Sequence, residues 1–269
     1  MSIAIERHEI STEAERMPPG MSIFDFPSER PQTRGRALVV EDNPINQRVI
    51  VQMIEKRGFK SDVASNGLEA VEMLSRAAYD LVLMDCQMPV MDGYEATSQI
   101  RQMEGSSRHT PIIAVTANAM VGDREKCLSA GMDDYLSKPV KIEALEEMLN
   151  RWCADEQKSR AVASPSSKIE NDILDMSAIE SLRELQGDGE DDLFREIVEI
   201  YIADAPAYIA DISLAVESAN AAAIERAAHT LKGSSASLGA HLLASACLEM
   251  EKLGRSGSLT GAGELLARI

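Results

Sequence analysis

Five polar residues follow short apolar segments, at positions that could place them in one site. Glu41 and Asp42 come directly after one apolar run, Asp85 lies near the end of a second, Thr116 closes a third, and Lys138 precedes a proline. Clustered carboxylates are the hard oxygen ligands that Mg²⁺ takes, one or two at a time, beside water and phosphate. A hydroxyl and an ammonium beside them would offset charge on a transferring phosphoryl group. The pattern predicts a phosphoryl-accepting site, although any single Asp at a strand end is more often a turn or cap residue.

These residues converge only if the segments before them form one sheet. Apolar runs of the strand type alternate with segments of helical spacing between residues 37 and 152. The predicted strands are 37–40, 60–65, 80–86, 111–116 and 134–136, and the predicted helices are 44–58, 68–77, 93–103, 120–130 and 142–152. This alternation predicts an α/β doubly wound, five-stranded parallel sheet of the flavodoxin-like type. With strand order 2-1-3-4-5, the site lies beyond the carboxyl ends of neighbouring strands.

One of the four histidines has surroundings that suit chemistry. His229 lies in a predicted helix, 221–238, on the face opposite the apolar stripe, together with Lys232 and Gly233. A solvent-facing neutral imidazole can act as a nucleophile, the ammonium could stabilise a phosphoryl group, and small neighbours would let another protein approach. By spacing alone, an ordinary solvated helix face is an equally good interpretation. A metal site is weakly supported, because no further ligand stands at the required spacing.

The part of the chain around His229 differs in character from the first half. Strand signals disappear after residue 176, and helical spacing covers 177–185, 192–217 (with Pro206 as a kink or break), 221–238, 241–252 and a short 262–269. This pattern indicates an all-α helical bundle. Residues 1–35 and 154–175 are rich in small and turn-forming residues. The predicted organisation is a flexible leader (1–35), an α/β domain (36–153), a linker (154–175) and a four-helix-type bundle (176–269).

The composition excludes several classes of protein. The 269 residues include 44 Asp and Glu against 27 Lys and Arg, a formal net charge of −17, and 45% hydrophobic residues. The acid excess argues against nucleic-acid binding, because no basic stripe is present to neutralise phosphates. No apolar run approaches the roughly 20 residues that span a bilayer, and no signal-peptide pattern is present. The four cysteines show no CxxC or zinc spacing, which is typical of a reducing compartment and favours a cytoplasmic location.

Residues 36–153 resemble a response-regulator receiver domain over the whole length of that family. The matching segments are VVEDNPIN (39–46), LMDCQMPVMDG (83–93), AVTAN (114–118) and SKPV (137–140). Their amino-acid sequences closely resemble those of receivers attached to hybrid histidine kinases. The resemblance implies that Asp85 is the phosphoacceptor. It implies that Mg²⁺ is held by Glu41, Asp42, Asp85 and the Gln87 carbonyl. It also implies that Thr116 and Lys138 bind the phosphoryl oxygens and that Tyr135 is the aromatic residue that reorients on activation.

Residues 176–269 resemble a histidine phosphotransfer domain. The segment AHTLKGSSASLGA (228–240) looks like the signature of that family, and FREIVEIYIADAP (194–206) is similar to its early helix. The resemblance implies that His229 is the phosphorylated residue. The predicted closing helix at 262–269 is shorter than the closing helix that is usual in this family.

Together the two resemblances predict a two-component phosphorelay intermediate that uses Mg²⁺. An upstream histidine kinase or kinase domain would supply the phosphoryl group to Asp85, and His229 would exchange it with Asp85 or with a downstream response-regulator receiver. No nucleotide-binding motif accompanies the two acceptors. We therefore expect no autophosphorylation from ATP, and whether to call the chain an enzyme is open.

Two other functions fit parts of the pattern. A Mg²⁺-dependent phosphatase could use Asp85 as its nucleophile, but it needs a general acid two residues later, where this chain has Gln87. A phosphorylation-switched scaffold would carry a phosphate on Asp85 without passing it to His229. The sequence does not indicate the stimulus, the cognate partners, the direction of flow or the oligomeric state.

Overall fold

The computed structural model describes residues 33–117, 121–153, 174–185 and 192–269. Residues 1–32 of the predicted leader and residues 154–173 of the predicted linker lie outside this description. Contacts between residues group the chain from Thr33 to Ile269 into one compact unit. Within the described ranges, no helix is long and apolar enough to cross a membrane.

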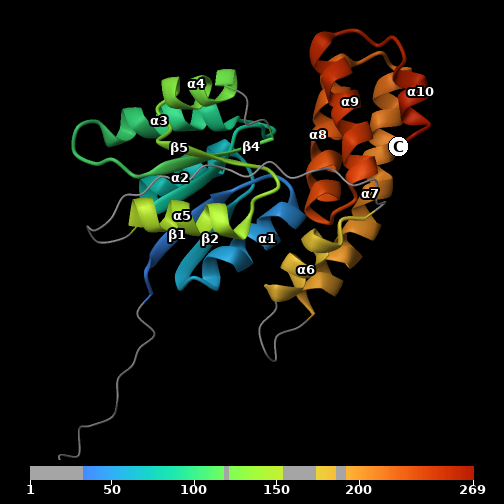
Figure 1. Ribbon diagram of the computed structural model, residues 1–269. Coiled ribbons are helices and arrows are strands. Elements are labelled where there is room, and N and C mark those ends of the chain that lie inside the picture. Colours follow the sequence, from blue (N-terminus) through green and yellow to red (C-terminus); the bar gives the residue numbers. More distant parts are fainter. Residues whose placement is uncertain (1–32, 118–120, 154–173, 186–191) are drawn as a thin grey trace, which may run out of the picture. The chain divides into compact units, whose positions relative to one another are not determined.

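The first half of this unit is a five-stranded parallel sheet with helices on both faces (Figure 1). Its strands are β1 (Gly35–Val40), β2 (Phe59–Ala64), β3 (Leu81–Asp85), β4 (Ile112–Thr116) and β5 (Asp134–Ser137). Every neighbouring pair is parallel, and the order is β2-β1-β3-β4-β5. The predicted fold and strand order are confirmed. Strands β3 and β4 are buried at every residue, which explains why they are apolar runs and not alternating patterns.

The helices between the strands divide into two layers. They are α1 (Pro44–Glu55), α2 (Gly67–Arg76), α3 (Gly93–Glu104), α4 (Val121–Ser129) and α5 (Ile142–Cys153). One core cluster joins α1 and α5 to one face of the sheet, and a second cluster joins α2, α3 and α4 to the other face. Helix α1 starts directly after β1 because the Asn43 side chain accepts hydrogen bonds from two backbone amides and Pro44 occupies the first turn. The chain therefore turns sharply at the end of β1, where Glu41 and Asp42 lie.

The second half of the unit is helical. It contains α6 (Met176–Glu184), α7 (Leu193–Glu217), α8 (Ala221–Ser237), α9 (His241–Ser256) and the short α10 (Ala262–Leu266). Buried residues of α7, α8, α9 and α10 form one core, to which Ile224, Leu231, Cys247 and Met250 contribute fully buried side chains. The predicted helices are present, with ends that differ by a few residues.

Helix α7 continues through Pro206 for 25 residues. A proline in a helix removes one backbone donor and leaves the carbonyl four residues earlier without its partner. Here both Pro206 and Ile202 are exposed, so water can reach that carbonyl. The alternative of a helix break at Pro206 is therefore wrong.

Candidate functional sites

Three carboxylates meet at the carboxyl ends of β1 and β3. Val40 pairs in register with Met84, so the residues that follow, Glu41 and Asp85, lie side by side. One oxygen from each of Glu41, Asp42 and Asp85 lies within 4.8 Å of the others. Glu41 and Asp85 are each only 1% exposed. Such a cluster of acids is strongly repulsive unless a cation balances it.

Lys138 supplies one such cation from the end of β5. Its Nζ lies 2.7 Å from Oδ2 of Asp85 and 2.7 Å from Oε2 of Glu41. Burial alone lowers the pKa of this lysine, but the two carboxylates outweigh burial and raise it. Lys138 is therefore charged, and it lies where it can contact a group bound to Asp85.

The acids are poorly compensated in spite of this lysine. Burial, opposed by Lys138 and reinforced by Glu41, raises the pKa of Asp85. Burial and the charge of Glu41 raise the pKa of Asp42 to about 6. One lysine therefore does not balance three carboxylates, and the oxygens are the hard ligands that suit a divalent cation such as Mg²⁺. The residues present fit that ion.

Three other predicted residues surround Asp85 or its strand neighbours. The Gln87 backbone amide donates a hydrogen bond of 3.1 Å to Asp85 Oδ1, so the chain curls around the acid at the start of the loop. Thr116 ends β4, next to β3 in the sheet, and is 7% exposed. Tyr135 lies in β5 and packs against the core cluster of α2, α3 and α4. All three are positioned around the carboxyl ends of the strands or along the adjacent edge strand.

A second group of polar residues joins α8 to α9. His229 Nδ1 lies 3.1 Å from Oε1 of Glu251, Lys232 Nζ donates to Oε2 at 2.5 Å, and Arg255 also donates to Oε1, at 2.8 Å. Burial alone would raise the pKa of Glu251, but the hydrogen bonds and charges of His229 and Lys232 hold it at about 2. The carboxylate is therefore ionised and accepts the proton on His229 Nδ1. That leaves Nε2 as the nitrogen with a free lone pair.

Burial lowers the pKa of His229, and its hydrogen bond with Glu251 opposes that effect. The net shift is downward, so the ring is neutral at neutral pH. A neutral imidazole with a fixed tautomer is the form that can attack phosphorus. The geometry of this second site therefore suits a nucleophile.

Comparison with known proteins identifies both halves. Residues 37–150 match the family model of the response regulator receiver domain, and residues 196–269 match the Hpt domain. The chain carries a receiver domain followed by an Hpt domain. These are domains of two-component signalling, and their combination supports a role in a phosphorelay.

Curated relatives match this chain over part of their own, longer sequences. The sensor histidine kinase GacS of Pseudomonas protegens is 34% identical over 225 residues, which cover 81% of this chain and 24% of GacS. The signal transduction histidine-protein kinase BarA of Shigella flexneri is 33% identical over 223 residues, 82% of this chain and 24% of BarA. Hybrid signal transduction histidine kinase B of Dictyostelium discoideum is 45% identical over 130 residues, 43% of this chain and 7% of that kinase. The chain thus spans at most about a quarter of these relatives.

Some solved structures are similar to part of this chain. One is the receiver domain of a Pseudomonas aeruginosa sensor histidine kinase with a magnesium ion coordinated in its active site cleft, 50% identical, covering 44% of this chain and 97% of that one, with a TM-score of 0.41. Another is the complex of the Saccharomyces cerevisiae histidine phosphotransfer protein Ypd1 with the receiver domain of Ssk1. The matched chain of that complex is 38% identical, the match covers 44% of this chain and 88% of that one, and the TM-score is 0.41.

Sequence reasoning missed two residues that hold the predicted site residues in place. Asn46 Nδ2 donates a hydrogen bond of 3.0 Å to Glu41 Oε1 in the receiver, and Glu251 holds His229 in the Hpt domain. Asn46 belongs to the receiver motif VVEDNPIN and follows Glu41 by five residues. The motif itself could therefore have pointed to Asn46. Glu251 is 22 residues from His229 on another helix, and no local spacing points to it.

The prediction that His229 faces solvent is wrong, since the residue is 8% exposed. The face of α8 that carries it contacts α9 on one side and receiver helix α1 on the other. Asn43 Nδ2 donates to Ser234 Oγ at 2.6 Å, and Ser237 Oγ donates to Asn46 Oδ1 at 2.8 Å. A Cβ at position 233 would come within 3.0 Å of the Asn46 amide nitrogen, so Gly233 makes this close approach easy.

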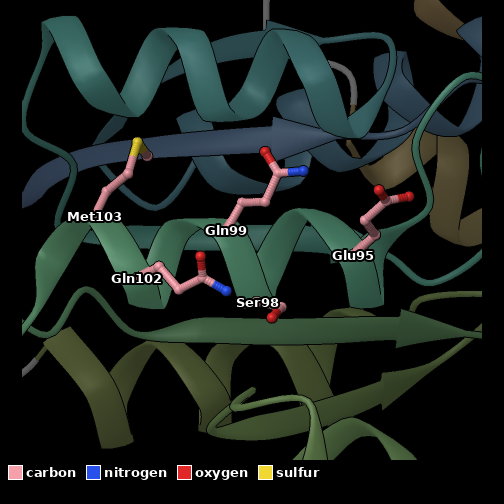
Figure 2. Close-up of a pocket in the computed structure, with 5 residues that line it drawn as sticks. All are labelled: Glu95, Ser98, Gln99, Gln102 and Met103. Carbon is pink, nitrogen blue, oxygen red and sulfur yellow. The ribbon is translucent and has the colours of Figure 1, made fainter.

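A shallow hollow of about 590 Å³ on the receiver is unrelated to either site (Figure 2). It is lined by residues of α3 alone, namely Glu95, Ser98, Gln99, Gln102 and Met103. None of the residues in the carboxylate cluster lines it. We assign it no role in the chemistry.

Replacing Glu251 by Gln tests the positioning of His229. The variant removes an ionised acceptor, so we expect the pKa of His229, followed by NMR titration, to fall further below its usual value. Lys232 also loses its buried partner, and we expect the free energy of unfolding to drop by about 3 kcal/mol in urea. Glu249→Gln is the matched control, because Glu249 lies on the same helix but is exposed. A His229 pKa that rises or stays the same in the Glu251 variant would contradict the assignment.

Proposed function

We propose that this chain is a phosphorelay intermediate in which Asp85 accepts a phosphoryl group with Mg²⁺ and His229 exchanges it. The observation that carries this proposal is the convergence of three carboxylates and Lys138 at the ends of β1, β3 and β5. The donor is a phosphohistidine of an upstream kinase, and the acceptor beyond His229 is a downstream receiver. The relatives described above, which are named as histidine kinases, support this assignment.

The residues of the receiver have separate tasks in the first transfer. The Asp85 carboxylate attacks phosphorus, and the bond from phosphorus to the donor nitrogen breaks as the acyl phosphate forms. Mg²⁺, held by Glu41, Asp42, Asp85 and the Gln87 carbonyl, would neutralise charge on the phosphoryl oxygens. Lys138 and Thr116 bind those oxygens from the side of β4 and β5.

The second transfer uses the neutral ring of His229. Its Nε2 attacks the phosphorus of the acyl phosphate, the bond between phosphorus and the Asp85 oxygen breaks, and the proton on Nδ1 stays hydrogen-bonded to Glu251. The phosphorylated imidazole carries positive charge on the ring, which the Glu251 carboxylate stabilises. Glu251 is thus a positioning residue for either direction of transfer.

We further propose that the exchange can take place within one chain. The hydrogen bond from Asn43 to Ser234 and the one from Ser237 to Asn46 support this, because they tie the start of the helix after β1 to the helix of His229. The same donors and acceptors would serve a receiver of another chain equally well. A mixture of Asp85→Asn chains and His229→Gln chains distinguishes transfer within a chain from transfer between chains. In this mixture, phosphate can reach His229 only from the Asp85 of another chain.

The test of the proposal is to supply acetyl phosphate and Mg²⁺ to the full chain and to follow the chemistry of the bound phosphate. We expect a base-labile acyl phosphate on Asp85 first, and then a base-stable phosphohistidine on His229. Label that stays on Asp85 in the presence of a cognate receiver would favour the phosphorylation-switched scaffold. No label at all, in a folded protein with Mg²⁺ present, would contradict the proposal.

Magnesium binding makes a prediction about stability. Because three acids share one lysine, Mg²⁺ at about ten times its dissociation constant should add about 1.4 kcal/mol to the free energy of unfolding. The gain should be smaller at pH 5 than at pH 7.5, because the raised pKa of Asp42, about 6, lets protons compete with the ion at the lower pH. Thermal unfolding with and without Mg²⁺ measures both effects. Asp42→Asn should lose most of the gain and Asp92→Asn should keep it; equal gains would argue against this site.

A further inference from the structure

Two cysteines lie against each other beside the carboxylate cluster. Cys86 directly follows Asp85, Cys127 lies in α4, and both belong to the same core cluster. Their sulfur atoms are 3.8 Å apart, and neither residue is in a disulfide bond. They are 3% and 1% exposed. Neither thiol has a task in the transfer chemistry described above.

The separation of the sulfurs is close to what a disulfide needs. A disulfide bond is about 2.05 Å long, so the two atoms must approach by less than 2 Å. Rotation about the two side-chain bonds moves a sulfur by that order, provided that the Cβ atoms stay close. Among the described residues, the one recorded sulfur–sulfur contact is that between Cys86 and Cys127, and Cys153 and Cys247 are also free thiols.

We propose that Cys86 and Cys127 are a modification site, at which hydrogen peroxide converts the two thiols into a reversible disulfide. One sulfur attacks a peroxide oxygen, the O–O bond breaks, and a sulfenic acid and one water form. The second sulfur then attacks the first, the S–O bond breaks, and a second water leaves with the remaining proton. Two thiols are oxidised, one peroxide is reduced to two waters, and no other reagent is consumed.

The reaction should be slow and selective for small oxidants. Both thiols are buried, so oxidants meet them seldom, and buried cysteines in proteins react slowly. Peroxide is small enough to reach a buried sulfur during brief openings of the domain. What sets Cys86 and Cys127 apart from the other cysteines is therefore that they can form a disulfide, and not that they react quickly with peroxide.

The disulfide would add a covalent tie where the receiver site is built. The Cys86 amide already donates to Val115 at 3.2 Å, and its carbonyl accepts from Gly93 at 3.3 Å, which anchors the loop between β3 and α3. A bond to Cys127 pulls this residue toward α4, and Asp85 and Gln87 are its neighbours in the chain. We infer that oxidation slows phosphoryl acceptance, and this consequence rests on the proposed function.

Mass spectrometry of the full chain tests the disulfide itself. The protein is treated with hydrogen peroxide, remaining thiols are capped with N-ethylmaleimide, and peptides are mapped without reduction. We expect a linked pair containing Cys86 and Cys127 that dithiothreitol separates, while the more exposed Cys153 shows only single-site products. The link should be absent in Cys127→Ser and present in Cys153→Ser. If Cys86 and Cys127 of the wild-type chain are oxidised but no disulfide links them, the proposal is overturned. This outcome needs no variant.

A second measurement tests the consequence. Loading of Asp85 from acetyl phosphate should fall several-fold in the oxidised wild-type chain, recover with dithiothreitol, and be unaffected by peroxide in Cys127→Ser. If the chain with the Cys86–Cys127 disulfide is phosphorylated on Asp85 at the same rate as the reduced chain, the regulatory consequence is overturned. A chain that fails to load before oxidation would overturn the proposed function, while the peptide map would still decide whether the disulfide forms.

Discussion

Asp85→Asn is expected to abolish phosphorylation of the chain by acetyl phosphate and Mg²⁺. An amide oxygen is a far weaker nucleophile than a carboxylate, so we expect at least a ~100-fold loss of loading, to the background of the reagent. Phosphate bound per chain, measured by phosphate-affinity electrophoresis, checks the result. The single change removes the oxygen that the mechanism requires while keeping the shape of the side chain.

The variant should nevertheless fold. Burial raises the pKa of Asp85, which means that the folded state disfavours the charged form, and a neutral amide relieves that cost. Lys138 keeps Glu41 as a partner at 2.7 Å. Asp92→Asn is a matched control in the same loop, because Asp92 is exposed and caps α3, and asparagine caps a helix equally well. Loading that survives in Asp85→Asn, or is lost equally in Asp92→Asn, would rule out Asp85 as the acceptor.

His229→Gln is expected to remove the base-stable phosphate and to leave the phosphate on the receiver in place. Glutamine can still donate to Glu251 from its amide, but it has no nucleophilic nitrogen. We expect transfer from the chain to a downstream receiver to fall by at least ~100-fold. Following the appearance of labelled downstream receiver over time gives the rate.

His241→Gln is the control for this change. His241 starts helix α9, is only partly buried, and pairs with Asp175 at 3.0 Å, in a position unrelated to Glu251. Its replacement should leave transfer unchanged. If instead His229→Gln transfers to a downstream receiver as fast as the wild type, the second step of the relay is wrong, although phosphorylation of Asp85 could still stand.

Much of the receiver follows from local sequence. Buried strands such as β3 and β4 are continuous apolar runs, and their alternation with helical spacing limits the topology to a few possibilities. The parallel register then requires residues after β1 and β3 to meet, which is why Glu41, Asp42 and Asp85 could be grouped before any coordinates. Pro206 shows where local rules are weaker, since packing along a long amphipathic helix outweighed one missing hydrogen bond.

By itself, the sequence determined the fold class through the alternation of apolar runs with helical spacing. The motifs at the strand ends and around His229 determined the two families and the candidate acceptors. Only the tertiary structure decided the exposure of His229, the partnership of His229 with Glu251, and the contact between Cys86 and Cys127. The physical reason is that periodicity within a helix reports which face is apolar but not what packs against the other face. Glu251 and Cys127 lie 22 and 41 residues from their partners, on different elements, and only packing between those elements brings them into contact.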